Sequence, residues 1–427
     1  MARILIAVVP IYGHVTPMIP LAKALAARGH DVLWSTTETF RAQVEAAGIT
    51  VARTAHTEDI RTDRGEYVPG GEKLEGIAAL RVDLKFGFID NAPRQLRDLH
   101  DAAAEFRPDL VLADTACLAA RLFSEETGTP FAVLNVVPMV LTSRDTAPFG
   151  LALPPSATLL GRVRNRGLQW LVEHVVFRDV QKHWNKTRRS VGLADSGWLM
   201  DAPKSAALYL NPSIPSFEYP RSDLPESVHF IGPVPAPPVA DWTPPAWWSE
   251  MFTGRPVVHV TQGTIANSEP ELIAPAIAAL ADENVLVVVS TGGADPSGLG
   301  LDEVPANVRV ERFIPYAELL PHVSAMVTNG GYGGVQLALT YGVPLVVAGA
   351  TEDKPEVAAR VAWSGVGVNL KSAAPHPDRI RFAVRSVLTE PRFTARAAEL
   401  RAEYAEYDAL TLGVEHIERV AGVPALD

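Results

Sequence analysis

Short apolar runs that alternate with segments of helical periodicity are the feature that most constrains the fold of this chain. The runs in the first half are Ile4–Val9, Asp31–Ser35, Thr50–Ala52, Leu110–Asp114 and Phe131–Val136, and those in the second half are Val257–Thr261, Val285–Ser290, Val308–Arg312, Ala325–Thr328 and Pro344–Ala348. Strands that alternate with helices pair in parallel, because a parallel connection needs a crossover. The pattern therefore predicts an α/β protein with two doubly wound domains.

Prolines cluster between the two series of runs, at 211–215, 232–238 and 244–245. Neither a helix interior nor a central strand tolerates this density, since proline lacks the backbone donor. We therefore expect an N-terminal domain over residues 1–210, a Pro-rich linker over 211–245 and a C-terminal domain over 246–405. Residues 406–427 predict a C-terminal helix, and the sequence leaves open whether it packs back on the N-terminal domain.

Length and charge exclude several classes of protein. The 427 residues include 38 Lys and Arg against 49 Asp and Glu, a net charge of −11, so the broad basic surface that nucleic acid requires is missing. The first apolar run ends at Pro10, well short of the about 20 residues that cross a bilayer. With Cys117 as the one cysteine, we expect a cytoplasmic protein without stable membrane insertion.

Two polar side chains follow runs of the first series. His14 lies just beyond the first run, and Asp114 ends the fourth. Parallel sheets bind ligands beyond the carboxyl ends of their strands. A carboxylate that fixes the tautomer of a histidine makes it a general base. Two interpretations stay open: a catalytic dyad of His14 and Asp114, or two residues that only cap helices.

A glycine-rich turn in the second series predicts a phosphate site. The segment Asn329-Gly-Gly-Tyr-Gly-Gly334 leads into a predicted helix over 335–341, and Gln262-Gly263-Thr264 follows the first run of that series. Free N–H groups at a helix start suit a diphosphate, although a tight turn for close packing is the structural alternative. The chain has no H-E-x-x-H, C-x-x-C or D-x-D motif, so we expect no metal and no other cofactor.

Together these blocks resemble the donor-binding signature of the inverting, GT-B-fold UDP-glycosyltransferase superfamily. The matching blocks are Phe313-Ile-Pro315, Leu319-Leu-Pro-His322, Val327–Gly334, Ala338-Leu339, Gly342–Val346 and Glu352-Asp353-Lys354, with Gly13-His14-Val-x-Pro17 and Asp114 in the first half. The resemblance covers almost the whole chain and is strongest to bacterial enzymes that glycosylate macrolides, other antibiotics and flavonoid-like acceptors. It implies the GT-B fold, in which two Rossmann-like domains face each other across a cleft.

The resemblance also implies a role for each block. His14, oriented by Asp114, would take the proton of an acceptor hydroxyl, and the sugar would transfer with inversion and without a metal. Phe313 would stack on the base, the glycine turns would hold the diphosphate, and Asp353 would bind the sugar. The implied donor-site residues are Gly13, Gly263, Thr264, Phe313, Ile314, Asn329, Gly331, Gly333, Gly334, Asp353 and Lys354.

The chain departs from the family pattern at four positions. Asn329 replaces a histidine, Gly334 replaces Ser or Thr, and Lys354 replaces a glutamine, which leaves the identity of the sugar open. Leu337 takes the place of a glutamate that holds both ribose hydroxyls. Because deoxythymidine lacks the 2′-hydroxyl, Leu337 favours a dTDP-sugar over a UDP-sugar, and both donors stay possible.

Apolar segments of the first half are candidates for the acceptor pocket. Its predicted residues are Phe86, Phe88, Ile89, Met139 and Phe149. They suit a hydrophobic small molecule, such as an antibiotic, polyketide or flavonoid-like compound, although some of them could simply pack the core. Two other functions stay open, a nucleotide-sugar epimerase of GT-B fold and a non-catalytic partner of a glycosyltransferase. The oligomeric state is open too.

Overall fold

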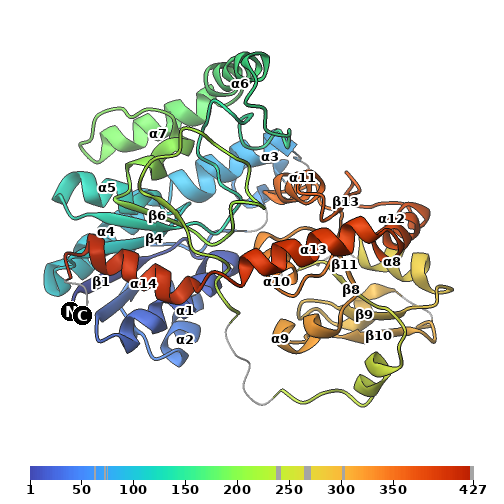
Figure 1. The fold of residues 1–427 in the computed structure, drawn as a ribbon. Coiled ribbons are helices and arrows are strands. Elements are labelled where there is room, and N and C mark those ends of the chain that lie inside the picture. Colours follow the sequence, from blue (N-terminus) through green and yellow to red (C-terminus); the bar gives the residue numbers. More distant parts are fainter. Residues whose placement is uncertain are drawn as a thin grey trace.

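Seven parallel strands form the sheet of the N-terminal domain in this computed structural model, which describes residues 1–61, 64–71, 74, 76–236, 242–263, 271–300 and 303–423 (Figure 1). Their order is β3-β2-β1-β4-β5-β6-β7. The strands are β1 (Arg3–Ala7), β2 (Asp31–Ser35), β3 (Thr50–Val51), β4 (Leu110–Asp114), β5 (Phe131–Leu134), β6 (Leu208–Asn211) and β7 (Val228–Phe230). The strand order reverses between β1 and β4, and such a switch point is where a doubly wound sheet binds its ligand.

The C-terminal domain repeats this plan with six parallel strands in the order β10-β9-β8-β11-β12-β13. The strands are β8 (Val257–Thr261), β9 (Leu286–Ser290), β10 (Val308–Glu311), β11 (Ala325–Thr328), β12 (Leu345–Val347) and β13 (Gly367–Asn369). All residues of β8, β9, β11 and β12 are buried, as expected for strands that helices cover on both faces. Here the order reverses between β8 and β11. The two doubly wound domains predicted from the sequence are confirmed.

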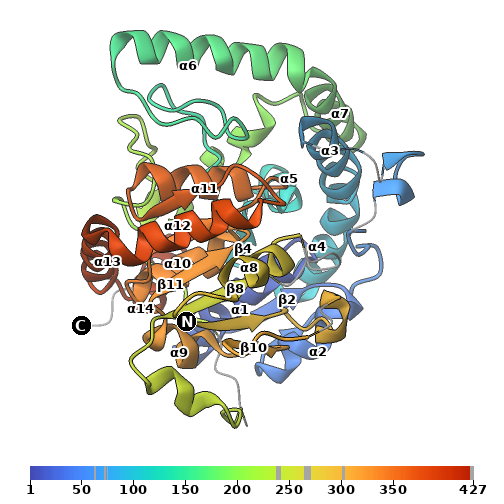
Figure 2. The same ribbon diagram turned by 90° about the vertical axis from the view of Figure 1, so that its right-hand side faces the viewer.

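Helices cover both faces of each sheet (Figure 2). In the N-terminal half they are α1 (Tyr12–Ala27), α2 (Glu38–Ala46), α3 (Gly76–Val82), η3 (Asp83–Ile89), α4 (Ala92–Phe106), α5 (Leu118–Thr127), α6 (Leu159–Leu171), η4 (Val172–Val176) and α7 (Arg178–Ser190). In the C-terminal half they are α8 (Ile273–Leu280), α9 (Tyr316–Leu319), α10 (Tyr332–Thr340), α11 (Lys354–Trp363), α12 (Pro377–Thr389), α13 (Pro391–Tyr404) and α14 (Ala409–Val420). The short helical turns are η1 (Arg64–Glu66), η5 (Leu199–Ser205), η6 (Trp248–Phe252), η7 (Pro296–Leu299) and η8 (Leu320–His322). Among these described helices, none combines the length and the apolar character that a membrane crossing needs.

The C-terminal helix α14 packs on the N-terminal domain, against α1 and β6 (Figure 1). Its Gly413 approaches Leu21 so closely that a Cβ there would lie 3.0 Å from the leucine side chain. Glu418 of α14 accepts from both Arg28 and His30, at 3.0 Å from each of the two side chains. The chain therefore crosses between the domains twice, once after β7 and once between α13 and α14.

Three strands were not predicted from the sequence. β6, β7 and β13 have three or four residues each and lie outside the apolar runs from which strands were predicted. β7 also lies inside the segment 211–245, for which the prolines predict a linker. Val228–Phe230 contains no proline, and it pairs at the edge of the sheet with β6. The N-terminal sheet thus extends to residue 230.

Candidate active site

His14 and Asp114 meet at the switch point of the N-terminal sheet. Asp114 is the last residue of β4 and is 1% exposed, while His14 lies in the first turn of α1. The carboxylate accepts the backbone N–H of Val9 at 2.6 Å and that of Ala116 at 2.7 Å. Its Oδ1 lies 2.8 Å from Nδ1 of His14. Because an ionised carboxylate only accepts, Nδ1 carries the hydrogen and Nε2 of the neutral ring is left to take up a proton.

Carboxylates of both domains influence the pKa of His14. Burial disfavours the charged ring and is the largest single influence, but Asp114, Asp353 and Glu352 together outweigh it and raise the pKa of His14 above 6.5. Conversely, burial raises the pKa of Asp353 to about 6, with Glu352 acting in the same direction and Lys354 and His14 opposing it. The charges of Glu352 and Asp353, which follow β12, therefore act on His14 across the domain boundary.

The glycine-rich turn of the C-terminal domain is held by Asn329. The side-chain amide of Asn329 donates to the carbonyl of Gln262, and its Oδ1 accepts the N–H of Gly331 at 3.4 Å. A Cβ on Gly263, which has φ +79°, would lie 3.4 Å from that same amide. Asn329 thus joins the turns that follow β8 and β11. Its amide nitrogen and its oxygen thus each make a hydrogen bond within the protein.

Backbone N–H groups open the helix that follows this turn. Gly331 is the N-cap of α10, Gly333 is exposed and Gly334 is half-buried. These groups lie at the positive end of the helix dipole, which suits a diphosphate. Thr264, also predicted for this site, lies outside the described residues. The roles of these glycines stay predictions.

Phe313 and Ile314 differ sharply in exposure. The Phe313 side chain is 51% exposed, so its ring is available for stacking, whereas Ile314 is 1% exposed and packs in the core. Only the backbone of Ile314 is therefore suited to contact a base, as the resemblance implies.

Tyr316 is a neighbour of the glycine turn that the sequence did not reveal. Its hydroxyl lies 3.5 Å from the Cβ position of Gly334 and hydrogen-bonds the Thr261 side chain at the end of β8, while burial raises its pKa to about 12. The missing side chain at Gly334 thus leaves space beside the hydroxyl of Tyr316.

Lys354 is not a free cation. It is buried, and its Nζ pairs with Glu352 and lies 3.3 Å from Oγ1 of Thr351. Glu352 adopts φ +56°, a conformation that a residue with a side chain rarely takes. Glu352 stands in one of the blocks that match the family, but no role was predicted for it from the sequence. Its only signal there was a second acid directly before the Asp353-Lys354 pair.

The predicted acceptor residues do not all reach one place. The Phe88 ring lies 6.5 Å from the His14 ring, centroid to centroid. Phe86 instead stacks on Tyr67 at 6.5 Å. Phe149 is partly buried against the N-terminal core.

Two of the acceptor predictions need correction. Ile89 and Met139 are 0% and 1% exposed, so in this structure neither presents surface to a ligand. Both pack in the hydrophobic core beneath β1 and β4. An apolar residue beside a loop has the same sequence signature whether it lines a pocket or fills a core.

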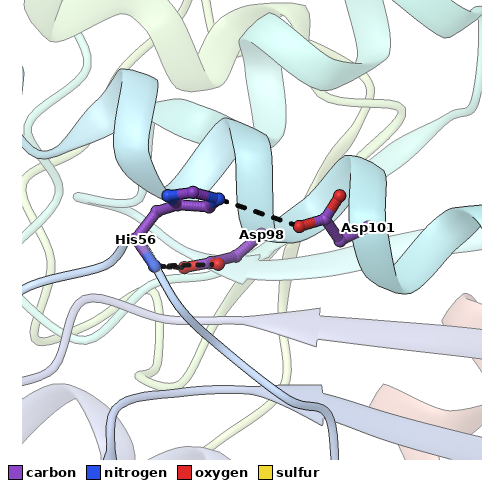
Figure 3. A group of neighbouring side chains, drawn as sticks. All are labelled: His56, Asp98 and Asp101. Carbon is purple, nitrogen blue, oxygen red and sulfur yellow. Dashed lines mark hydrogen bonds and ion pairs between the residues drawn. The ribbon is translucent and has the colours of Figure 1, made fainter.

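A separate group of side chains has ligand atoms close enough to hold a metal ion: His56, Asp98 and Asp101 (Figure 3). Asp98 accepts the N–H groups of Ala55, His56 and Thr57 and the Thr57 hydroxyl, at 2.6–3.3 Å. Nε2 of His56 is 3.9 Å from Asp101. Because both oxygens of Asp98 already accept, the group's evident role is to fasten the segment 55–57 to α4.

Comparison with known proteins gives matches over the whole chain. Residues 273–411 match the family model described as erythromycin biosynthesis protein CIII-like, C-terminal domain. The chain is 49% identical to the 4'-demethylrebeccamycin synthase of Lentzea aerocolonigenes, over 98% of this chain and 99% of that protein. It is 35% identical to UDP-glycosyltransferase 2 of Phaeomoniella chlamydospora, over 98% and 96% of the two chains.

The fold is also similar to solved structures. The calicheamicin glycosyltransferase CalG4 superposes with a TM-score of 0.75 at 24% identity and covers all of both chains. The glycosyltransferase of kitacinnamycin superposes with a TM-score of 0.76, also at 24% identity, over 99% of this chain and all of the other. At this identity the likeness concerns the fold, which is the GT-B arrangement of two facing Rossmann-like domains.

Proposed function

This chain belongs to the GT-B glycosyltransferases of the natural-product type, and on that premise we propose that it transfers the sugar of a UDP-sugar or dTDP-sugar to a hydroxyl of a hydrophobic small molecule, with inversion and without a metal. The observation that carries the proposal is the His14–Asp114 pair, 2.8 Å apart at one switch point and facing the acids of the other domain. The relatives at 49% and 35% identity are both named as enzymes of synthesis or glycosyl transfer.

In the proposed reaction, Nε2 of His14 accepts the proton of the acceptor hydroxyl. The acceptor oxygen forms a bond to the anomeric carbon while the bond from that carbon to the diphosphate oxygen breaks on the opposite face, which inverts the configuration. The imidazolium that forms is stabilised by Asp114. The electron pair of the broken bond stays on the nucleoside diphosphate, whose charge the N–H groups at the start of α10 would stabilise.

The donor nucleotide stays open between two candidates. Leu337 on α10 places no carboxylate at the ribose position, which favours dTDP, whereas the relative at 35% identity is named for UDP. Antibiotic, polyketide or flavonoid-like compounds are the proposed acceptors. The name of the relative at 49% identity, a 4'-demethylrebeccamycin synthase, supports a natural-product acceptor of this kind.

Two measurements test the proposal. Calorimetric titration with UDP and with dTDP, in the presence of a chelator, should show binding of at least one nucleotide. The His14→Ala variant should then lose product formation while it still binds that nucleotide. An unchanged turnover rate in His14→Ala would show that another group is the base, and a folded protein that binds neither nucleotide would refute the donor proposal.

A further inference from the structure

One carboxylate of the C-terminal domain holds a loop of the N-terminal domain. The backbone N–H groups of Gly150 and Ala152 both donate to Oε1 of Glu356, each at 2.8 Å. Glu356 lies in the first turn of α11, three positions after Asp353. Figure 2 shows α11 below the loop that precedes α6. Asp353 and Lys354, which are predicted to bind the donor, and the residue that holds this loop thus belong to one helix start.

The loop is shaped around that carboxylate. Gly150 and Ala152 both have positive φ, +95° and +51°. Alanine takes this conformation only where its surroundings impose it. Here two converging N–H groups and the side chains of Phe149 and Leu151, which pack against the N-terminal core, provide that constraint. Without the carboxylate, two part-buried N–H groups would lose their acceptor.

Glu356 is itself fixed by a buried network of charges. Its Oε2 accepts from Arg360 at 2.9 Å, and Arg360 donates to Glu218 at 3.0 Å. These three side chains are between 1% and 4% exposed as residues. Glu218 also accepts the hydroxyl of Tyr332, the first residue of α10, at 3.1 Å, and the N–H of Met139 at 3.3 Å. The starts of α10 and α11 are therefore bonded to two segments of the N-terminal domain.

From this geometry we propose that Glu356 is a positioning residue, which sets the loop 149–152, and with it Phe149, for the acceptor. The proposal rests on the proposed function, because it assigns the loop to the acceptor side of that reaction. It assigns no chemical step to Glu356. Because Glu356 lies in the first turn of α11, the loop takes its bonded conformation only while that helix start is in place.

Hydrogen exchange tests, independently of turnover, whether Glu356 holds the loop 149–152. We expect the amides of Gly150 and Ala152 to exchange at least ten times faster in Glu356→Ala than in the wild type. Glu356→Gln should fall between them, because its amide oxygen can still accept from the loop. The matched control is Glu403→Ala, which removes a carboxylate that accepts the N–H of Ser216 at 3.2 Å, away from the loop. Equal exchange at the two loop amides in Glu356→Ala and wild type would overturn the proposal.

Steady-state kinetics test the link to the acceptor. With quercetin as the acceptor and UDP-glucose or dTDP-glucose as the donor, Glu356→Ala should raise the KM for quercetin at least tenfold. Its kcat should stay within about threefold and its nucleotide Kd should not change. Faster exchange with an unchanged KM would overturn the positioning role. A wild type that binds nucleotide but does not glycosylate quercetin would count against the proposed acceptor class. The hydrogen-exchange result would still decide whether Glu356 holds the loop.

Discussion

Replacing Asp114 by asparagine perturbs the proposed base with the smallest change in shape. The carboxylate accepts from His14 and Ala116 with Oδ1 and from Val9 with Oδ2. Whichever way the asparagine amide turns, its NH₂ group faces one of these donors. Either Val9 loses its acceptor, or His14 faces a donor that favours the tautomer with the hydrogen on Nε2, which is not a base.

The size of the effect follows from two losses. The imidazolium formed in the reaction loses its carboxylate, and the ring loses the bond that orients it. General-base catalysis contributes about 100-fold to 10,000-fold, so we expect kcat/KM to fall by that factor, or about 3 to 5 kcal/mol of barrier.

The pH dependence of kcat/KM should change in this variant as well. A general base works in its neutral form, so the acid limb of kcat/KM follows the pKa of His14. Asp114 is the first cause that raises this pKa and burial opposes it. Removal of the Asp114 charge therefore lowers the pKa, and the acid limb of Asp114→Asn should shift to lower pH. Asp353, whose pKa is about 6, is unchanged in the variant and keeps its own contribution to the acid limb.

The assay is kcat/KM from pH 5 to 9, with nucleotide titration as the check on the donor site. Asp109→Asn is the matched control, because Asp109 precedes the other end of β4 and accepts from Arg3 at 2.8 Å. It should leave the profile unchanged. If Asp114→Asn keeps the wild-type value of kcat/KM at its pH-independent maximum, and its acid limb lies at the same pH as in the wild type, His14 is not the base.

Three further perturbations test other parts of the structure. Arg360→Met removes the guanidinium shared by two buried glutamates, of which Glu218 keeps only Arg221 at 3.7 Å, and should cost about 3–5 kcal/mol of unfolding free energy in a chemical denaturation series; a loss below about 1 kcal/mol would contradict the buried network. Gly349→Ala would bring a Cβ to 2.0 Å from the backbone oxygen of Asn329 and should abolish nucleotide binding, whereas Gly167→Ala on α6 meets nothing within 4 Å and should fold and bind normally; circular dichroism and titration compare the two. Leu337→Glu should raise the affinity for UDP relative to dTDP about tenfold, as expected for a new charged hydrogen bond to the 2′-hydroxyl, and an equal effect on both nucleotides would contradict the ribose assignment.

The elements that positioned the site were predictable because their signals are local. The strands β1, β4, β8 and β11 are mostly apolar and almost entirely buried, and the strand ends of a doubly wound sheet converge at its switch points. His14 and Asp114, 100 positions apart, could therefore be placed side by side from the sequence. Their 2.8 Å contact agrees with that placement.

The residues that were missed act through contacts that no local pattern in the sequence records. Glu356 looks in the sequence like a solvated acid in the first turn of a helix. Its partners Gly150 and Ala152 are more than 200 positions away, and no periodicity records such a contact. Lys354 was expected among the donor-site residues, but it pairs with Glu352, whose φ of +56° the sequence does not display.

The return of α14 to the N-terminal domain decides how hybrids of this enzyme with its relatives should be built. A hybrid with a single junction in the segment 211–245 would take α14 from the relative and pack it against α1 of this chain. Its residues at positions 413 and 418 would then have to match Leu21 and Arg28, as Gly413 and Glu418 do here. A hybrid with a second crossover between α13 and α14 keeps that helix with its native surface. The unit that recombination can exchange is thus an internal segment of the chain, bounded at both ends, rather than its C-terminal half.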